Sequence, residues 1–296
     1  MLDYIWLTFG THHYVVVNGV QDVVNRLTTN IKYIHLSSPI SAISADPQDP
    51  SFADVHCAVP STSETKVYTG FNHIIFAAQA NSAVPILKNY LPSLPPSSSE
   101  QRERIDGLVK CLGTFRYRPT IVINHTDGSL MPDHPADKRD LNLVCLDPNA
   151  PPLTENDPNC VGQSYTMATH VLPLSPKPAR TVYQTTNPII SPEPSSILSI
   201  ARLERAILTP SSKRSLSLLS KPHPTRRTRW WRECPVLQES TLGDLQGRVG
   251  GNGVGVWVCG SYASAGIPLL EGCVVSAKNV VKGILKSEGE SGNYKL

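Results

Sequence analysis

Apolar residues near the C-terminus form a short continuous run and then recur at helical spacing. The run from Val254 to Cys259 is bounded by glycines, which is typical of a strand buried on both faces of a parallel sheet. From about Leu269 the chain has helical periodicity, with apolar residues on one face (Cys273, Ala277, Val280, Val281, Ile284) and lysines on another (Lys278, Lys282, Lys286). Pro268 and Glu271 suit the first turn of that helix. The pattern therefore predicts a strand, a loop and a helix.

The loop between this strand and helix contains Gly260, Ser261 and Gly266. Such small residues would let a ligand approach the unpaired backbone N–H groups at the helix start, which favour polar or anionic groups. The loop therefore predicts a cofactor contact. The alternative stays open, because many α/β proteins contain such units and bind nothing there.

The earlier part of the chain alternates helical and strand-like patterns. Asn18 can cap a helix whose apolar residues are Val20, Val23, Val24 and Leu27, although Asn18-Gly19 also suits a hairpin turn. Further segments read as strands (31–36, 55–59, 66–68, 121–123), as a fully buried strand (71–78), as a polar helix (100–112), as a Pro-rich linker (92–99) and as loop (132–160). The alternation predicts an α/β fold.

Composition narrows the functional class. The 296-residue chain has a formal net charge of only +3, so no global field favours nucleic acid, and the basic stretch 221–232 reads as a solvated loop. Its seven cysteines are scattered without a C-x-x-C pair, which indicates a reducing, cytoplasmic setting. No apolar run approaches the ~20 residues of a membrane-spanning helix, so no membrane association is expected.

Two phrases of the C-terminal stretch carry a family resemblance. Cys259-Gly-Ser-Tyr, followed by Gly266-Ile-Pro-Leu-Leu-Glu-Gly-Cys-Val, resembles the C-terminal FAD-binding segment of flavin-containing amine oxidase-like proteins. The resemblance implies that Gly260 and Ser261 lie by the ribityl-diphosphate of FAD. It places Leu270, Glu271 and Gly272 at a helix start under the isoalloxazine ring. In the first half of the chain it implies that Ile40 offers backbone atoms to the adenine, and that Ala77 and Ala78 approach the cofactor.

The same resemblance implies the architecture and the reaction. It gives an incomplete Rossmann-like FAD-binding domain (14–82 and 249–290) interleaved with an α+β substrate-side domain (83–248). The implied reaction is hydride removal from a small-molecule substrate, commonly an amine, to flavin N5, with reoxidation by dioxygen.

The family's N-terminal Gly-x-Gly-x-x-Gly unit is missing from this chain. The abrupt apolar start of the sequence also looks cut from something longer. A second chain could complete the FAD site. The alternative function is a truncated, non-catalytic remnant or interaction protein.

A second alternative rests on metal chemistry. His125, Asp127 and His170, with Arg180 ten residues further on, imitate the two-histidine, one-carboxylate ligand set of iron(II) oxygenases. That chemistry needs a double-stranded β barrel, whereas this chain alternates strands with helices. No Gly-x-Ser-x-Gly motif or phosphate loop points to another enzyme class.

Overall fold

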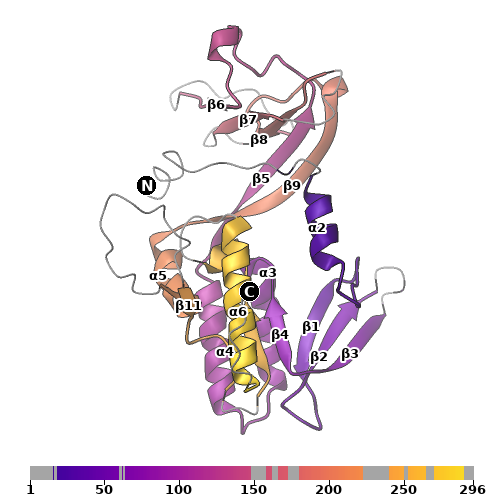
Figure 1. The fold of residues 1–296 in the computed structure, drawn as a ribbon, viewed down its shortest axis with the longest axis vertical. Coiled ribbons are helices and arrows are strands. Elements are labelled where there is room, and N and C mark those ends of the chain that lie inside the picture. The colour runs from indigo at the N-terminus through magenta and orange to yellow at the C-terminus, as the bar shows by residue number, and fades with distance from the viewer. Residues whose placement is uncertain are drawn as a thin grey trace. The chain divides into compact units, whose positions relative to one another are not determined.

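The computed structural model shows a mixed α/β chain that divides into two compact units (Figure 1). Unit 1 holds the described parts of Tyr33–Arg116 and Ala206–Leu296, and unit 2 those of His13–Lys32 and Tyr117–Arg205. The structure describes residues 16, 19–59, 62, 64–147, 158–161, 166–172, 180–222, 240–249, 253–264 and 270–289. None of the described helices combines the length and apolar character needed to cross a lipid bilayer.

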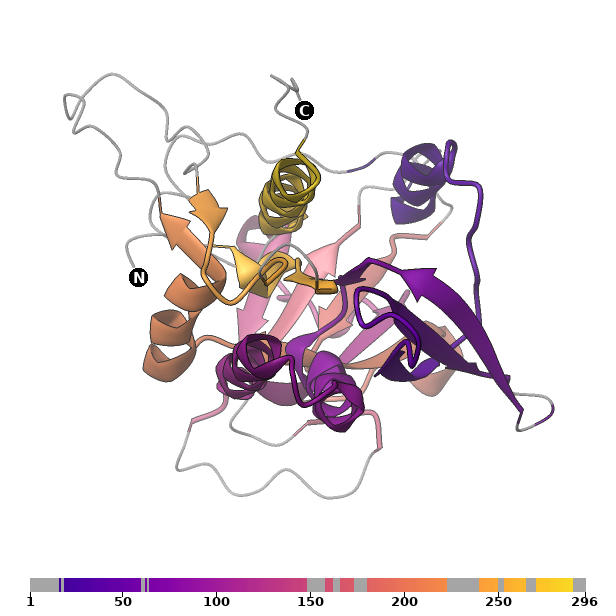
Figure 2. The same cartoon turned by 90° about the horizontal axis from the view of Figure 1, so that it is seen from below.

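Unit 1 is built around two parallel strands, β4 (His73–Phe76) and β12 (Gly255–Val258), paired residue for residue. Helix α6 (Leu270–Ser287) covers one side of the pair, and α3 (Ala80–Tyr90) and α4 (Ser99–Leu112) lie on the other (Figure 2). The predicted strand at 254–259, the C-terminal helix and the polar helix at 100–112 are therefore confirmed.

The fully buried strand predicted over 71–78 is wrong in extent and in burial. β4 is shorter, and Ile75 is 47% exposed. β4 pairs only with β12 in this sheet, so it is not the central, fully buried strand that the apolar run predicts.

A second sheet in unit 1 is antiparallel and consists of β1 (Ile40–Ala45), β2 (Ala53–Ala58) and β3 (Thr65–Phe71). β2 and β3 match the strands predicted at 55–59 and 66–68. The strand predicted over 31–36 is wrong: those residues form no regular element, and their apolar side chains are exposed. Their apolar composition suits a strand, but none of the described strands pairs with them.

The Pro-rich segment 92–99, predicted as a linker, is a packed turn between α3 and α4. It begins with the short 3-10 helix η1 (Leu91–Ser93), and Leu94 is buried. The Arg102 guanidinium donates to the carbonyl oxygens of Leu91 (3.1 Å), Pro95 (3.4 Å) and Leu94. An arginine from the following helix thus satisfies carbonyls that a solvated linker would expose to water.

The rest of unit 1 follows Ala206. Helix α5 (Pro210–Leu219) begins with a capping box in which Thr209 and Ser212 bond each other's backbone N–H groups. It leads into the antiparallel pair β10 (Ser220–Pro222) and β11 (Ser240–Leu242). Most of the basic stretch 221–232 lies outside the described residues.

Unit 2 contains a five-stranded sheet in the order β6-β7-β8-β5-β9. Its strands are β5 (Arg116–His125), β6 (Leu141–Val144), β7 (Met167–Val171), β8 (Tyr183–Thr186) and β9 (Ile197–Ile207). β5 extends the strand predicted over 121–123 in both directions. The loop predicted over 132–160 is wrong in part, because it contains η2 (Pro135–Asp137) and β6. A further 3-10 turn, η3 (Pro194–Ser196), precedes β9.

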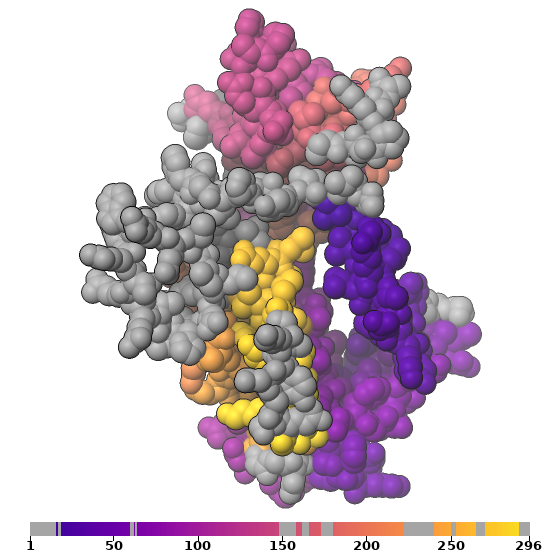
Figure 3. Space-filling view, viewed as in Figure 1, coloured from indigo at the N-terminus to yellow at the C-terminus, as the bar shows by residue number. Residues whose placement is uncertain are grey.

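Residues Val20–Thr28 form helix α2, so the helix predicted after Asn18 is confirmed and the alternative hairpin turn at Asn18-Gly19 is wrong. Gly19 takes the cap position, and the predicted cap Asn18 lies outside the described residues. None of the α2 side chains is buried, and the helix surface is open on the face shown in Figure 3. Of the apolar residues that predicted the helix, Val20, Val24 and Leu27 are exposed and Val23 is partly exposed.

Candidate functional site

The carboxyl ends of β4 and β12 meet at one edge of unit 1. The Cys259 N–H donates to the Phe76 carbonyl (3.0 Å), so the parallel pairing continues one residue past β12, to the last residue of β4. Helix α3 starts a few residues after β4, and α6 follows β12. Open α/β sheets bind ligands beyond the carboxyl ends of their strands. The structure thus brings the predicted residues Ala77, Gly260 and Ser261 to one edge.

Tyr262 joins the two loops at this edge. Tyr262 is buried, its hydroxyl donates to the Ala78 carbonyl (3.1 Å), and its ring packs edge-on against Phe115 with centroids 5.2 Å apart. The predicted cofactor neighbour Ala78 therefore has a protein donor on its carbonyl. Sequence reasoning missed Tyr262, because its contacts reach 184 residues back along the chain.

Ser276, buried on α6, contacts the backbone of the loop after β12. Its Oγ accepts the Gly260 N–H (3.0 Å) and can donate to the Gly260 carbonyl (3.1 Å) or to the Gly272 carbonyl (2.7 Å). The Ala263 N–H donates to the Gly260 carbonyl (3.0 Å). Gly260 has φ 148°, a region that favours glycine. One amide predicted to face the flavin is thus engaged by a serine, whereas residues 265–269 lie outside the described part of the chain.

The start of α6 has one buried and two exposed predicted residues. Leu270 is 78% exposed and Glu271 is exposed, whereas Gly272 is buried. A Cβ on Gly272 would lie 3.1 Å from the Ser261 carbonyl oxygen and 3.4 Å from the Ser264 Cβ. The absence of a side chain at Gly272 therefore lets the loop pack against α6, whether or not a cofactor binds.

Ile40 lies elsewhere in unit 1. It begins β1, opposite Cys57 in the antiparallel sheet, and half of its surface is exposed. The structure places it in the antiparallel sheet rather than at the β4–β12 edge.

The predicted iron ligands are not assembled. No group of three or more His, Cys, Asp or Glu side chains among the described residues has a metal-holding arrangement. His125 is buried, its Nε2 lies 2.7 Å from Thr185 Oγ1, and its Nδ1 accepts the Asp127 N–H (3.2 Å). Asp127 accepts the N–H groups of Ser129 and Glu193, and His170 is exposed on β7. His125 is therefore a core histidine whose two ring nitrogens are both in use, and the iron(II) interpretation is wrong.

Burial sets the pKa of His125. Desolvation lowers it below the ordinary value of 6.5, and the nearby Asp127 charge opposes this shift only partly. The pKa of Asp127 is lowered mainly by the hydrogen bond from the Glu193 backbone. With Nδ1 accepting, His125 is neutral and donates through Nε2 to Thr185, which also bonds Thr169 (2.9 Å). This network joins β5, β7 and β8 inside unit 2.

A second polar network lies at the opposite, amino end of β4. His73 Nδ1 accepts the Trp257 indole N–H (3.0 Å), and His73 Nε2 lies 2.8 Å from the Glu288 carboxylate. Arg248 also pairs with Glu288 (3.1 Å). The hydrogen bond from His73 is the largest cause of the lowered pKa of Glu288. These contacts attach the residue that follows α6 to the start of β4.

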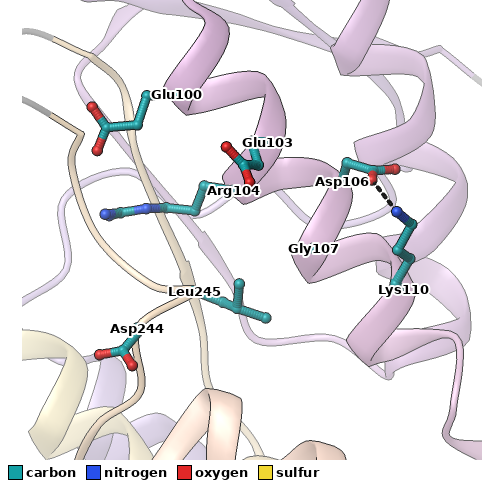
Figure 4. Close-up of a pocket in the computed structure, with 8 residues that line it drawn as sticks. All are labelled: Glu100, Glu103, Arg104, Asp106, Gly107, Lys110, Asp244 and Leu245. Atoms are coloured by element: carbon teal, nitrogen blue, oxygen red, sulfur yellow. Dashed lines mark ion pairs between the residues drawn. The ribbon is translucent and has the colours of Figure 1, made fainter.

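A surface hollow of about 410 Å³ lies between α4 and the turn at Asp244–Leu245 (Figure 4). Its lining has four carboxylates, Glu100, Glu103, Asp106 and Asp244, against the two cations Arg104 and Lys110. Lys110 pairs with Asp106 (2.6 Å), and Arg104 donates to the Arg248 carbonyl (2.9 Å). This acidic lining would repel a diphosphate, so the hollow does not suit FAD.

The described cysteines are all free thiols. Burial raises the pKa of the Cys111 thiol to about 12, and burial followed by the influence of Cys273 raises that of Cys259. Thiols with raised pKa values are poor nucleophiles, so Cys111 and Cys259 have the environment of buried structural thiols.

No protein-family model and no curated protein matches the chain. A functional assignment therefore rests on the residues, their geometry and the resemblance of the C-terminal segment.

Proposed function

We propose that the β4–β12 edge is part of an FAD site, and that the chain acts as part of a FAD-dependent oxidoreductase similar to amine oxidases. The observation that supports this most is the arrangement of Gly260 and Ala77. A glycine at φ 148° and a second loop residue follow two adjacent parallel strands, at the edge where such sheets bind ligands.

The engaged Gly260 amide is compatible with ligand binding. The Ser276 hydroxyl donates to the Gly272 carbonyl at 2.7 Å, so it keeps a partner if the loop shifts and the Gly260 N–H leaves its Oγ. The Gly260 N–H would then be available to an anionic oxygen, and the Ser261 hydroxyl lies on the next residue.

A further polypeptide would supply the missing phosphate contacts. The parallel sheet has only two strands, and the outer edge of β4 carries no strand in the described structure. Parallel sheets are normally larger and flanked by covering elements. A second chain that brings a strand, a Gly-x-Gly-x-x-Gly turn and a helix would extend the sheet at β4.

When bound, FAD would supply the redox chemistry by accepting a hydride from the substrate at N5. The residues of this chain would orient the cofactor through the two loops. The substrate remains a small molecule, commonly an amine in the family that the segment resembles.

NMR amide shifts of the full chain test the site directly. An incomplete site should bind FAD with an affinity on the order of 1 mM, or about 4 kcal/mol, which NMR detects. We expect FAD to shift the amides of Ala77, Ala78, Gly260 and Ser261 and those of the first turn of α6. Absent shifts, or shifts confined to other residues, would refute the site.

A matched pair of variants controls this test. Gly260→Val places a side chain at the loop, where a Cβ would already lie 3.2 Å from the Tyr262 ring, and should abolish the FAD-induced shifts. Gly70→Val replaces another glycine of positive φ (83°), which faces open space on β3, and should preserve them. Equal loss in both variants would mean that the response depends on general stability rather than on the loop.

The alternative function, a non-catalytic interaction protein, is favoured by a different observation. All apolar side chains of α2 remain unburied, including Val20 and Leu27. Large exposed apolar surfaces commonly mark protein contacts. If FAD produces no shifts at the β4–β12 edge, this alternative becomes the preferred function.

A further inference from the structure

Strand β9 presents an unpaired edge at one end of the unit 2 sheet. It follows β5 in the strand order and has no strand on its other side in the described structure (Figure 1). The strand has 11 residues, and those from Leu198 to Arg205 are all exposed. Such an edge offers a row of backbone N–H and C=O groups to another strand.

Two of the usual protections of an edge strand are absent from β9. Its sequence, Ile-Leu-Ser-Ile-Ala-Arg-Leu-Glu-Arg-Ala-Ile, contains neither proline nor lysine. Leu198 is 60% exposed, Ile200 37% and Leu203 40%. The other terminal strand, β6, has only four residues. A long, exposed edge with apolar residues is the surface on which strands of separate chains pair.

The charges on β9 distinguish between possible registers in a pair of two identical β9 strands. In an antiparallel pair, residues directly opposite each other point to the same face of the sheet, and along each strand the face alternates from one residue to the next. In a pair of identical strands related by a two-fold axis, opposite residues must therefore both have even numbers or both have odd numbers, and the axis passes through a residue position. Centring the axis on Leu203 places Arg202 of one copy opposite Glu204 of the other, twice by symmetry. With the axis at Arg202 or at Glu204, that residue lies opposite its own copy, so like charges face each other. With the axis at Ala201, Arg202 lies opposite Ile200 and Glu204 lies opposite Leu198, so neither charge has a charged partner.

We propose that β9 pairs antiparallel with β9 of a second copy of this chain, with the two-fold axis at Leu203. Each copy then contributes one Arg202–Glu204 pair, and the Leu203 side chains face each other. Arg202 donates through Nη2 to the Pro158 carbonyl and to Asn159 Oδ1 (both 2.9 Å). A guanidinium has further N–H groups on its other two nitrogens, so Arg202 can bond a carboxylate of the second copy as well.

A charge swap in the full chain tests the register. Sedimentation equilibrium should show a concentration-dependent dimer. Arg202→Glu or Glu204→Arg alone introduces two like-charge pairs and should weaken the dimer at least about tenfold. The double variant Arg202→Glu with Glu204→Arg restores opposite charges and should recover the wild-type dissociation constant. A monomer at all accessible concentrations, or a double variant no tighter than the singles, would overturn the proposal.

Cysteine crosslinking provides a readout that does not depend on charge. Leu203→Cys should form an intermolecular disulfide between the substituted positions, because directly opposite residues have Cβ atoms about 5 Å apart. Leu198→Cys is the matched control on the same strand. In the proposed register its two copies lie ten residues apart along the strands, on the order of 30 Å, so they should not crosslink. Peptide mapping separates these products from native thiols such as the exposed Cys145. Crosslinking at 198 but not at 203 would contradict the register.

Discussion

At the scale of single residues, the absence of a side chain at Gly283 sets how closely α6 approaches β12. A Cβ there would lie 2.2 Å from Leu242 Cδ1 and 2.6 Å from Trp257 Cζ3. Trp257 is part of the core cluster with Val280 and is almost fully buried, so it has little room to shift. The glycine at this position therefore serves the packing of the core.

We predict that Gly283→Ala lowers the free energy of unfolding by about 1–3 kcal/mol, because it overpacks this core. The matched variant is Gly107→Ala in α4. There the nearest atom is the end of the Leu245 side chain at 2.9 Å, which can rotate away. Gly107→Ala should be neutral or stabilising by up to about 1 kcal/mol through helix propensity. Urea denaturation measures both, and equal effects would contradict the packing explanation.

His125 gives unit 2 a pH-dependent stability. Its pKa in the folded protein is lowered, so the unfolded chain binds a proton more readily. The contribution is complete above the ordinary value of 6.5 and is lost as the pH falls below it. We predict that the unfolding free energy declines more steeply between about pH 7 and pH 5 in the wild type than in His125→Gln, which carries no titrating ring. Parallel pH profiles would show that another group controls this range.

At the scale of elements, helix α6 fixes the conformation of the loop that connects it to β12. Ser276 on α6 bonds Gly260, so α6 fixes the loop that we assign to the cofactor. We predict that Ser276→Ala lowers stability by about 1 kcal/mol and speeds hydrogen exchange of the Gly260 amide. If that amide binds FAD, the variant should also bind FAD more tightly than the wild type. Faster exchange without tighter binding would argue that the amide has a purely structural role.

Elements with a strong local pattern could be predicted from the sequence, and those decided by distant contacts could not. β12, α4 and α6 follow their apolar periodicity, which belongs to the segment itself. The segment 31–36 has the composition of a strand but pairs with no strand in the described part of the chain. The turn at 92–99 is ordered by Arg102, a contact that composition does not reveal.

The candidate site shows the same division. The phrase Cys-Gly-Ser-Tyr indicated the loop at Gly260, and the structure places Ala77 beside it through the pairing of β4 with β12. The tyrosine of that phrase and Ser276 were missed as participants, because their bonds depend on the three-dimensional path of the chain. Ile40 and the iron ligands were inferred from short phrases, and the structure places these residues in other environments.

At the scale of the whole molecule, the two units have separate cores. Trp257, Leu87 and Leu108 are among the buried residues of unit 1, whereas Ile123, Met167 and His125 are buried in unit 2. A chain with separate cores need not unfold as one cooperative system. The effect of a core substitution should then remain within its own unit.

Native-state hydrogen exchange of Gly283→Ala tests this expectation. We predict that protection falls for amides of β12, β4 and α6 in unit 1, where the added methyl group overpacks the core. Protection of Ile123 and Thr185 in unit 2 should stay at the wild-type level, because the substitution touches none of their neighbours. His125→Gln should give the reverse pattern. A uniform loss of protection in both units would show that they unfold together, and stability effects measured on either unit would then belong to the entire chain.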